Sequence, residues 1–270
     1  MTGMLRGIRP QHQLGQSFLM EAAIADREVG YARIDARDTV LEVGAGIGNL
    51  TARLASRAAH VIAIECDRQF RPRLDGLATA CGNITLLWGD ARAVPLPAFT
   101  KIVSNLPYRV ALPIVLRLLE YPFAGGVVML QENMAQHLCA GPGEAGYGRV
   151  SVTVQRRAHA ELLESVPRSA FWPRPNVDSA IVRLRPVARP FALPSDEAFR
   201  RLLEHAFRYR DDRLSAALRR LAGAAEVVPL LPGRLRDKRV CALTPAEFGE
   251  ISRFLDAHKV RLPAVATPAT

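Results

Sequence analysis

Four consecutive residues, Asn105-Leu106-Pro107-Tyr108, place two hydrogen-bond acceptors beside an aromatic ring. The Asn105 side-chain carbonyl and the Leu106 backbone carbonyl could each accept one hydrogen of an exocyclic amine such as N6 of adenine. Holding both hydrogens would draw the nitrogen toward tetrahedral geometry and localise its lone pair. Pro107 would fix the backbone direction, and Tyr108 would offer a face on which an extruded base can stack. The tetrapeptide therefore predicts transfer of an electrophilic methyl group to an amine.

A glycine-rich turn upstream, Gly44-Ala45-Gly46-Ile47-Gly48, could hold the donor of that methyl group. Its glycines permit a tight turn and a close approach of the backbone to a ligand. A dinucleotide fingerprint needs its third glycine five residues after the first, whereas here Asn49 takes that position. The spacing favours a nucleotide-like cofactor without a pyrophosphate.

Two carboxylates follow the next predicted strands. Glu65 comes 21 residues after Gly44, where an acidic side chain can accept hydrogen bonds from both ribose hydroxyls. Asp90 follows the strand after that and would lie beside the adenine ring at the same edge of the sheet. Either side chain alone could be an ordinary solvated loop residue. Together with the glycine turn, they predict a cofactor pocket at the carboxyl ends of successive strands.

The elements that must position these residues alternate between strands and helices. A glycine turn and a helical stretch at residues 50–58 follow the first short apolar strand, and helical stretches separate most of the other strands. This alternation predicts an α/β fold with a mostly parallel sheet covered by helices on both faces. The predicted strands are residues 39–43, 60–64, 83–87, 101–104 and 126–130.

The pattern changes beyond Gly141. Residues 141–148 form a predicted loop, residues 150–154 alternate like a strand, and residues 179–184 form a further strand that would extend the sheet in antiparallel fashion. Three prolines within residues 186–194 indicate a linker. We therefore predict a catalytic domain over residues 1–186 and a small basic helical domain over residues 187–270. Ser195 would begin its first helix, which has one apolar face formed by Phe199, Leu202, Leu203 and Ala206.

The charge of the chain predicts a polyanionic partner. Its formal net charge is +10, and 33 of its 36 basic residues are arginine, whose planar fork binds phosphate bidentately. Residues 181–270 carry 17 basic and 10 acidic side chains and so hold most of the excess. Coding bias or a preference for heat-stable residues could also produce so many arginines.

Other site classes find little support. The four cysteines are scattered and the six histidines dispersed, so we expect buried free thiols and no metal site. No apolar run approaches the roughly 20 residues that span a bilayer, and the N-terminal segment lacks the apolar stretch of a secretion signal. We therefore expect a cytoplasmic protein without a membrane partner.

Together, these motifs resemble those of the rRNA adenine N6,N6-dimethyltransferases, over about residues 10–186. Within that family, the sequence is similar to the small-subunit (KsgA) type. The resemblance implies a class I methyltransferase fold, S-adenosyl-L-methionine as cofactor, and two adjacent adenines in the 3′-terminal hairpin of small-subunit rRNA as substrate. It also implies a monomer that acts on a pre-ribosomal small subunit. The segments that carry the resemblance are Gly15-Gln16-Ser17-Phe18-Leu19, Leu41-Glu42-Val43-Gly44-Ala45-Gly46, Ile64-Glu65, Gly89-Asp90, Asn105-Leu106-Pro107-Tyr108, Tyr147-Gly148-Arg149 and Pro173-Arg174-Pro175-Asn176-Val177-Asp178-Ser179.

The resemblance also adds site residues. It implies that Ser17 and Leu19 touch the methionine end of the cofactor, and that Phe171 packs against the target base opposite Tyr108. From the residues alone, Phe171 is a predicted core anchor. The other implied cofactor contacts are Gly44, Gly46, Glu65, Asp90 and Asn105.

Three departures from the family pattern stand out. Ser17 replaces the usual Asn or His, which puts a direct polar contact from this position in doubt. Trp172 replaces the small residue or proline that commonly follows the phenylalanine. The basic cluster of the small domain, residues 207–213, is interrupted by Asp211 and Asp212, so it could be either an RNA-binding surface or a solvated helix face.

Three alternative functions remain open at this stage. A large-subunit methyltransferase of the macrolide-resistance type would share the same catalytic core. A DNA adenine methyltransferase usually has proline in the second position of the tetrapeptide, where this chain has Leu106. The chain could also act chiefly as a ribosome-assembly checkpoint that binds immature subunits. Two segments favour the small-subunit type: Tyr147-Gly148-Arg149 and the proline-containing motif at residues 173–179.

Overall fold

The computed structural model describes residues 7–11, 15–187 and 191–263, which fold into two compact units. The first unit comprises residues 1–135 and 159–186, and the second comprises residues 136–158 and 187–270. Each unit contains its own clusters of buried apolar side chains. The two units are therefore described separately.

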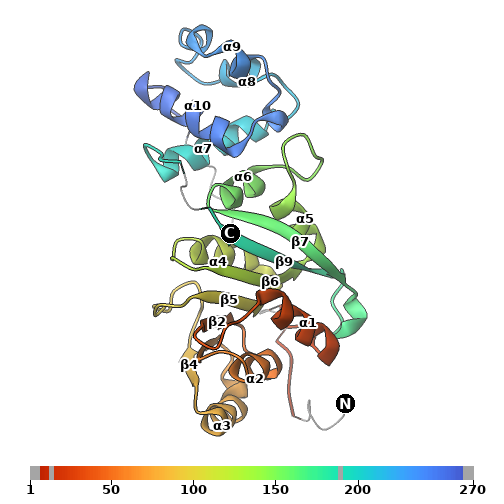
Figure 1. The fold of residues 1–270 in the computed structure, drawn as a ribbon. Helices are drawn as coiled ribbons and strands as arrows, with labels where there is room; N and C mark the ends of the chain where they lie inside the picture. Colours follow the sequence, from red (N-terminus) through yellow and green to blue (C-terminus); the bar gives the residue numbers. More distant parts are fainter. Residues whose placement is uncertain (1–6, 12–14, 188–190, 264–270) are drawn as a thin grey trace. The chain divides into compact units, whose positions relative to one another are not determined.

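A seven-stranded sheet with the order β4-β3-β2-β5-β6-β9-β7 forms the centre of the first unit (Figure 1). Strands β2 to β6 pair in parallel, and β9 pairs antiparallel with β6. The predicted mostly parallel sheet and its antiparallel extension are thus confirmed. The strands are β2 (Thr39–Val43), β3 (His60–Glu65), β4 (Ile84–Trp88), β5 (Lys101–Asn105), β6 (Gly125–Gln131), β7 (Ala158–Val166) and β9 (Ser179–Pro186).

The central strands are rich in aliphatic residues because both of their faces are covered. In β2, Val40 and Leu41 point to opposite faces and both are fully buried. Val40 belongs to a buried cluster with Val29 and Leu54, which come from two helices. Glu42 therefore points toward the same helical layer as Val40, an unusual place for a carboxylate.

Helices flank the sheet of the first unit (Figure 1). In α1, the residues Ile24, Ala25, Glu28 and Val29 are all buried, because their spacing of three or four puts them on one face. α2 begins after Gly48 and matches most of the predicted helix at residues 50–58. The helices that begin in this unit are α1 (Ala22–Ala32), α2 (Asn49–Ala55), α3 (Arg71–Cys81), α4 (Ala111–Leu118) and α5 (Glu132–Cys139).

A second, two-stranded sheet joins distant parts of the first unit. β1 (Phe18–Leu19) pairs antiparallel with β8 (Phe171–Trp172), and Leu19 lies opposite Phe171. The Phe18 and Trp172 rings stack with their centroids 6.4 Å apart. This pairing fixes the segment that carries Ser17, which is needed at the site described below.

The second unit is helical and has a core of its own. Ser195 caps α7 as predicted, because its side chain accepts a hydrogen bond from the Ala198 N–H. Phe199, Leu202, Leu203 and Ala206 are buried, which confirms the predicted apolar face. The helices are α6 (Arg149–Gln155), α7 (Asp196–Phe207), α8 (Leu214–Leu218), α9 (Gly233–Arg236) and α10 (Pro245–Ala257).

Residues 150–154 form helix α6, so the predicted strand there is wrong. The Ser151 hydroxyl accepts from the Gly148 N–H at 3.0 Å and donates to the His137 carbonyl. Val152 packs into the same buried cluster as Tyr147. Tertiary packing of one helix face therefore outweighs the strand preference of three valines.

The boundary between the units differs in part from the predicted one. The chain does divide between residues 186 and 187, but residues 136–158 belong to the second unit rather than the first. The cause is visible in the packing: Tyr147 is fully buried and donates a hydrogen bond to the Leu243 carbonyl at 2.7 Å. Part of the predicted linker, residues 188–190, lies outside the described residues.

The thiols do not all lie in the core. Cys66 and Cys81 are exposed, and Cys139 and Cys241 are partly buried, so the prediction of buried thiols is wrong. Cys81 is the last residue of α3 and is exposed, although its spacing of seven from the buried Leu74 puts it on the same side of the helix. Within the described ranges, no three His, Cys, Asp or Glu residues gather as a metal would require. No helix among them is long and apolar enough to cross a membrane.

Candidate active site

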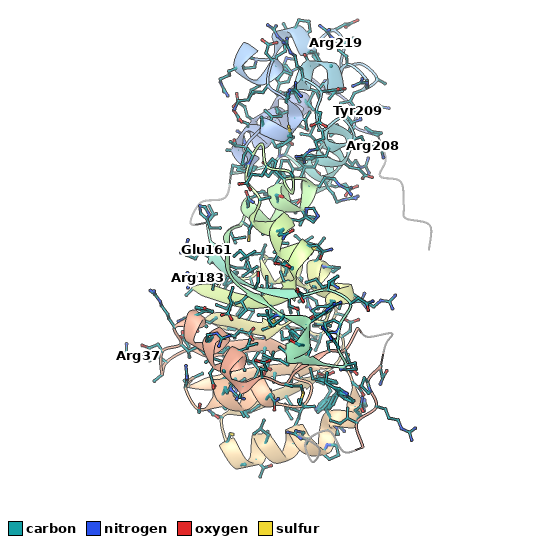
Figure 2. The ribbon with its side chains drawn as sticks, turned by 90° about the vertical axis from the view of Figure 1, so that its right-hand side faces the viewer. Arg37, Glu161, Arg183, Arg208, Tyr209 and Arg219 are labelled. Atoms are coloured by element: carbon teal, nitrogen blue, oxygen red, sulfur yellow. The ribbon has the colours of Figure 1, made fainter. Side chains whose placement is uncertain are left out.

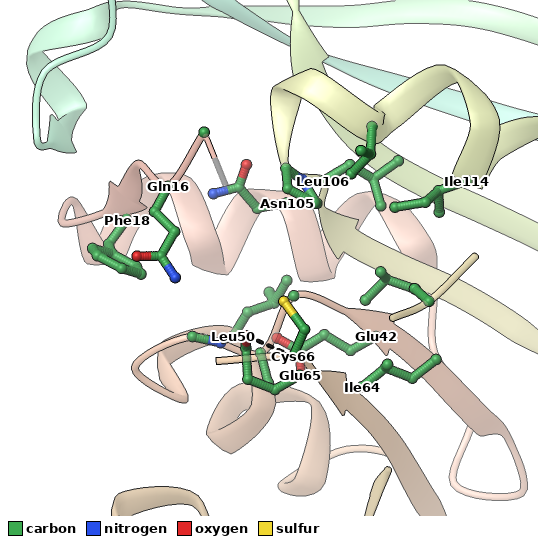
Figure 3. Close-up of a pocket in the computed structure, with 18 of the residues that line it drawn as sticks. Gln16, Phe18, Glu42, Leu50, Ile64, Glu65, Cys66, Asn105, Leu106 and Ile114 are labelled. Carbon is green, nitrogen blue, oxygen red and sulfur yellow. Dashed lines mark hydrogen bonds between the residues drawn. The ribbon is translucent and has the colours of Figure 1, made fainter. Parts of the chain in front are cut away.

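A cavity lies at the carboxyl ends of the parallel strands in the first unit (Figure 3). The strand register brings these ends to one edge, because Val43 pairs with Ile64, Glu65 with Trp88 and Asn105 with Met129. Of the predicted site residues, only Phe171 is absent from the cavity lining. Those that line it are Ser17, Leu19, Gly44, Gly46, Glu65, Asp90, Asn105, Leu106, Pro107 and Tyr108.

The glycine turn forms the floor of the cavity in a conformation that needs glycine. Gly44, Gly46 and Gly48 have φ angles of 80°, 51° and 78°, which L side chains rarely adopt. A Cβ atom on Gly46 would lie 3.2 Å from the Phe18 ring. The Gly44 N–H donates to the Ile64 carbonyl at 2.8 Å, which fixes the turn against β3. The turn can therefore approach a ligand closely, as its spacing predicts.

Glu65 is the last residue of β3 and is held by three backbone donors. Its carboxylate accepts from the N–H groups of Gly46, Cys66 and Asp67 at 2.7–2.8 Å. Burial raises the pKa of Glu65, and these hydrogen bonds oppose that effect. The Cys66 and Asp67 N–H groups both bond to Oε1 and the Gly46 N–H bonds to Oε2, so Oε2 can still accept from a ligand hydroxyl. The observed geometry suits the predicted contact with a ribose.

Asp90 lies just beyond β4 and lines the cavity beside Arg92. The two side chains form an ion pair with an N–O distance of 2.6 Å, and this hydrogen bonding lowers the pKa of Asp90. Arg92 also lines the cavity, although its role was not predicted from the sequence. Asp90 is thus a charged acceptor at neutral pH, in the position expected for the adenine end of a nucleotide cofactor.

The predicted catalytic tetrapeptide begins at the last residue of β5. The Asn105 amide nitrogen donates to the Ser17 carbonyl at 3.5 Å, so its carbonyl oxygen remains an acceptor for a ligand. Leu106 is buried, and its N–H donates to the Met129 carbonyl at 3.1 Å. Ser17 accepts this hydrogen bond through its backbone carbonyl, so the contact does not depend on which side chain stands at position 17.

Tyr108 and Phe171 have different environments. The Tyr108 ring lines the cavity, and its hydroxyl forms a 2.5 Å hydrogen bond with the Ser179 hydroxyl. Burial raises the pKa of Tyr108, so the hydroxyl is neutral at physiological pH. Phe171 is 4% exposed and packs with Leu19 and Ile24. Tyr108 lines the cavity, and its stacking on a ligand stays a prediction, whereas Phe171 has the core position that its sequence context alone predicts.

Besides Arg92, two acidic residues of the cavity had no role predicted from the sequence. Glu42 lies within the Leu41–Gly46 motif that carries the family resemblance, but that resemblance gave its side chain no role. Glu28 lies on α1, and both side chains line the cavity (Figure 3 labels Glu42). The spacing of Glu28 from Ile24 and Ala25 could have placed it on the buried face of the helix. Its proximity to the cavity could not be read from that spacing.

The fold and the cavity together define a methyltransferase of the Rossmann-like class. The crystal structure of a dimethyladenosine transferase from Plasmodium falciparum matches with a TM-score of 0.79 and 26% identity, covering 91% of this chain and 99% of that one. The crystal structure of the 23S rRNA methyltransferase ErmE matches with a TM-score of 0.66 and 27% identity, covering 88% and 99%.

The chain belongs to the ribosomal RNA adenine dimethylase family, which matches residues 8–256. Among curated relatives, the probable ribosomal RNA small subunit methyltransferase A of Thermococcus onnurineus is 37% identical, over 94% of this chain and 95% of its own length. The protein of the same name from Methanosarcina acetivorans is 38% identical, over 91% and 94%. The family resemblance drawn from the motifs is therefore confirmed.

Proposed function

We propose that the protein uses S-adenosyl-L-methionine to dimethylate N6 of two adjacent adenines in the 3′-terminal hairpin of small-subunit rRNA. The observation that carries this proposal is the position of Asn105 at the end of β5, in the same cavity as the glycine turn and Glu65. An amide acceptor is thereby held beside the site that suits a nucleoside cofactor. The names of the curated relatives and of the Plasmodium structure support this assignment.

The residues present fit the cofactor. Glu65 offers buried carboxylate oxygens to ribose hydroxyls, Asp90 offers an acceptor at the adenine end, and the Gly44–Gly48 turn leaves room for close backbone contact. Ser17 and Leu19 line the part of the cavity proposed for the methionine end. When bound, S-adenosyl-L-methionine would supply an electrophilic methyl group.

The chain's own contribution to catalysis is to hold and orient the target amine. The Asn105 side-chain oxygen and the Leu106 carbonyl would accept the two N6 hydrogens and localise the nitrogen lone pair. Tyr108 would stack on the extruded base, which returns about 1–3 kcal/mol against a flipping cost of a few kcal/mol. Each transfer replaces one N6 hydrogen, which leaves as a proton. Phosphate contacts must provide the remaining binding energy.

We propose that the second unit provides phosphate contacts. Arg208, Arg213 and Arg219 are exposed in this unit, and Figure 2 labels two of them. Arg210 has a structural role, because it donates to the backbone carbonyls of Tyr147 and Glu144. Part of the interrupted basic cluster therefore stabilises the fold, and Arg208 is paired with Glu204 at 3.5 Å. The exposed Arg213 and Arg219 would be available to RNA. We further propose that the protein acts as a monomer in the cytoplasm, on a pre-ribosomal small subunit.

Methylation of purified ribosomal subunits tests the proposed substrate. Small and large subunits from cells that lack this protein would each be incubated with the enzyme and methyl-labelled cofactor, followed by mapping of the modified adenines. We expect label in the small subunit alone, on two adjacent adenines, and at least a 100-fold lower rate with Asn105→Ala. Label confined to the large subunit would instead identify the macrolide-resistance type. Absence of label from both would contradict the proposal.

A checkpoint role is compatible with the same site and needs a separate measurement. Under that view, Asn105→Ala would abolish methylation while leaving association with immature small subunits intact. Cosedimentation of wild-type protein and the variant with those subunits measures this directly. Association that is lost together with methylation would argue against a binding role independent of catalysis.

A further inference from the structure

The loop between β4 and β5 carries Asp90 but has little regular hydrogen bonding of its own. Residues 89–100 form neither helix nor strand. Gly89 is fixed at the start of the loop, because its N–H donates to the carbonyl of the last residue of β3 at 2.9 Å. After it, the N–H groups of Ala93 and Val94 both donate to the Asp90 carbonyl at 2.9 Å and close a single turn. Such a turn needs an anchor outside the loop if Asp90 is to keep a defined position.

Arg117 on α4 provides that anchor. Its guanidinium donates to the Ala91 carbonyl and, at 2.7 Å, to the Val94 carbonyl. α4 also reaches the cavity, since Ile114 lies three residues before Arg117 and lines it (Figure 3). The guanidinium is planar and its donors have a fixed spacing, so two bonds from one group fix both the position and the orientation of the turn.

Hydrogen bonding, rather than charge, is the main effect of Arg117 on Asp90. The hydrogen bonds from Arg92 are the largest cause of the lowered pKa of Asp90, and the charge of Arg117 is a smaller one. Loss of Arg117 would therefore leave Asp90 ionised at neutral pH. It would remove the bond to the Ala91 carbonyl, which belongs to the residue directly after Asp90, and so release the carboxylate from its position.

We propose that Arg117 is a positioning residue that sets the selectivity of the cavity for adenine at the end where Asp90 lies. The inference rests on the cofactor and on the role of Asp90 assigned in the proposed function. An ionised carboxylate only accepts hydrogen bonds, so it favours a base with an exocyclic amine over one with a carbonyl oxygen. A displacement of about 1 Å is enough to lose such a bond. Arg117 itself lies outside the cavity lining and acts only through the loop.

Calorimetry with two cofactor products tests this selectivity without turnover. One is S-adenosylhomocysteine, and the other is S-inosylhomocysteine, in which a carbonyl oxygen replaces the exocyclic amine of the base. We expect wild-type protein to bind the adenine compound roughly tenfold or more tightly, because a hydrogen bond to a charged group is lost in the other. Arg117→Met keeps the aliphatic length and removes the donors, so the preference should fall to about threefold or less. Arg117→Lys can still donate and should recover part of it.

Hydrogen exchange of the loop is the second readout. The N–H groups of Arg92, Ala93 and Val94 all bond to Asp90, so their protection reports how well the turn is held. In Arg117→Met, the peptide covering residues 89–94 should exchange about tenfold faster, with no change elsewhere in the sheet. Arg37→Met is the control, because it removes an exposed arginine of the same unit (Figure 2). It should change neither the base preference nor the exchange of the loop.

The outcomes separate the role of Arg117 from the proposed function. Loss of the base preference together with faster exchange in Arg117→Met, and partial recovery in Arg117→Lys, would support the inference. Equal weakening of both ligands would assign Arg117 a purely structural role, and an unchanged preference would also overturn the inference. Arg117→Gln gives the same comparison should the methionine variant not fold. If wild-type protein bound neither ligand, or both equally, the proposed cofactor or the role of Asp90 would be wrong, and the inference would fall with it.

Discussion

Asn105 and Glu65 occupy equivalent places, each as the last residue of a strand, yet their surroundings suit them to different tasks. Glu65 is fixed by three backbone N–H groups and is 6% exposed, which suits an acceptor of permanent ligand contacts. Asn105 is held from one side only, by the Ser17 carbonyl, so its own carbonyl remains free. Under the proposed roles, one sheet edge would carry both the acceptor that binds the cofactor and the acceptor that activates the substrate amine.

Substitution of Tyr108 should affect turnover more than cofactor binding. Tyr108→Ala removes a stacking surface worth about 1–3 kcal/mol, so we expect kcat to fall roughly 10- to 100-fold with little change in cofactor affinity. Tyr108→Phe keeps the ring and loses only the hydrogen bond to Ser179. It should retain most of the activity. Glu65→Ala is the contrast, because it should mainly weaken cofactor binding. Equal losses of cofactor affinity in Tyr108→Ala and Glu65→Ala would contradict these roles.

The raised pKa of Glu28 predicts how the stability of the ligand-free protein depends on pH. Burial raises its folded pKa to about 8, against an unfolded value near 4.3. Between these values the folded state binds a proton that the unfolded state has lost, so its stability falls as pH rises and levels off above about pH 8. Relative to wild type, Glu28→Gln should therefore become more stable by up to about 1.4 kcal/mol per pH unit across this window.

Urea unfolding of both proteins at several pH values between about 5 and 9 measures that difference. Groups whose pKa is lowered, such as Asp90 and Glu164, act in the acid range and are common to both proteins, so they cancel in the comparison. A difference that stayed constant with pH would show that Glu28 is ionised in the folded protein.

At the scale of elements, the turn between β2 and α2 requires glycine for two separate reasons. Gly46 has a positive φ, and a Cβ atom there would meet the Phe18 ring, which belongs to β1. Gly46→Ala should therefore cost about 1–2 kcal/mol of backbone strain and weaken cofactor binding by displacing the segment next to Ser17. Thermal unfolding and cofactor titration measure both effects.

Gly30 provides the matched control for that substitution. It lies within α1, and a Cβ atom there would have no neighbour within 4 Å. Gly30→Ala should stabilise the protein by roughly 0.5–1 kcal/mol, because alanine loses less conformational entropy in a helix. Cofactor affinity should not change. If both substitutions acted alike, the local conformation of the turn would not explain the effect of Gly46.

Local sequence patterns predicted the elements whose burial follows from their own periodicity. The central strands are continuous apolar runs, and α7 has an N-cap and a regular apolar face, so their positions were predicted to within a few residues. α6 was predicted as a strand because its valines alternate in the sequence. Its helical conformation depends on packing in the second unit, which the local pattern does not show. β7 was not anticipated, because the Ala, Glu and Leu residues of Ala158–Val166 are typical of helices.

The same limit applied to the site. Glu65, Asp90 and Asn105 follow strands of one parallel sheet, so their convergence follows from chain topology. Glu28 comes from a helix that reaches the cavity only after packing, and no spacing in the sequence links it to Glu42. For Phe171 the two kinds of sequence evidence disagree. The family resemblance implies contact with the target base, whereas the neighbouring residues predict a buried core position. In the structure it is paired with Leu19 and buried, and contact with a base stays a prediction.

At the scale of the whole molecule, charge and chemistry are divided along the chain. The lining of the cavity comes from residues 15–114, whereas the excess of positive charge is concentrated in residues 181–270. Several of the arginines in that region are already engaged in ion pairs, since Arg200 and Arg201 pair with Glu197, and Arg220 with Asp212. The arginines that can meet RNA are therefore fewer than the composition suggests.

This division predicts that RNA binding and cofactor binding respond differently to salt. A protein that neutralises 6 to 10 phosphates loses roughly 10³–10⁵ in affinity between 50 and 200 mM salt, whereas a buried cofactor contact changes little. Arg219→Gln should lower the slope of log affinity against log salt by about 1, if the side chain meets one phosphate. Arg37→Gln, on an exposed residue of the first unit (Figure 2), is the charge-matched control. Filter binding of a small-subunit rRNA hairpin across a salt series measures each slope. A flat salt dependence in wild-type protein, or equal changes in both variants, would mean that the arginines of the second unit do not form the RNA contact surface.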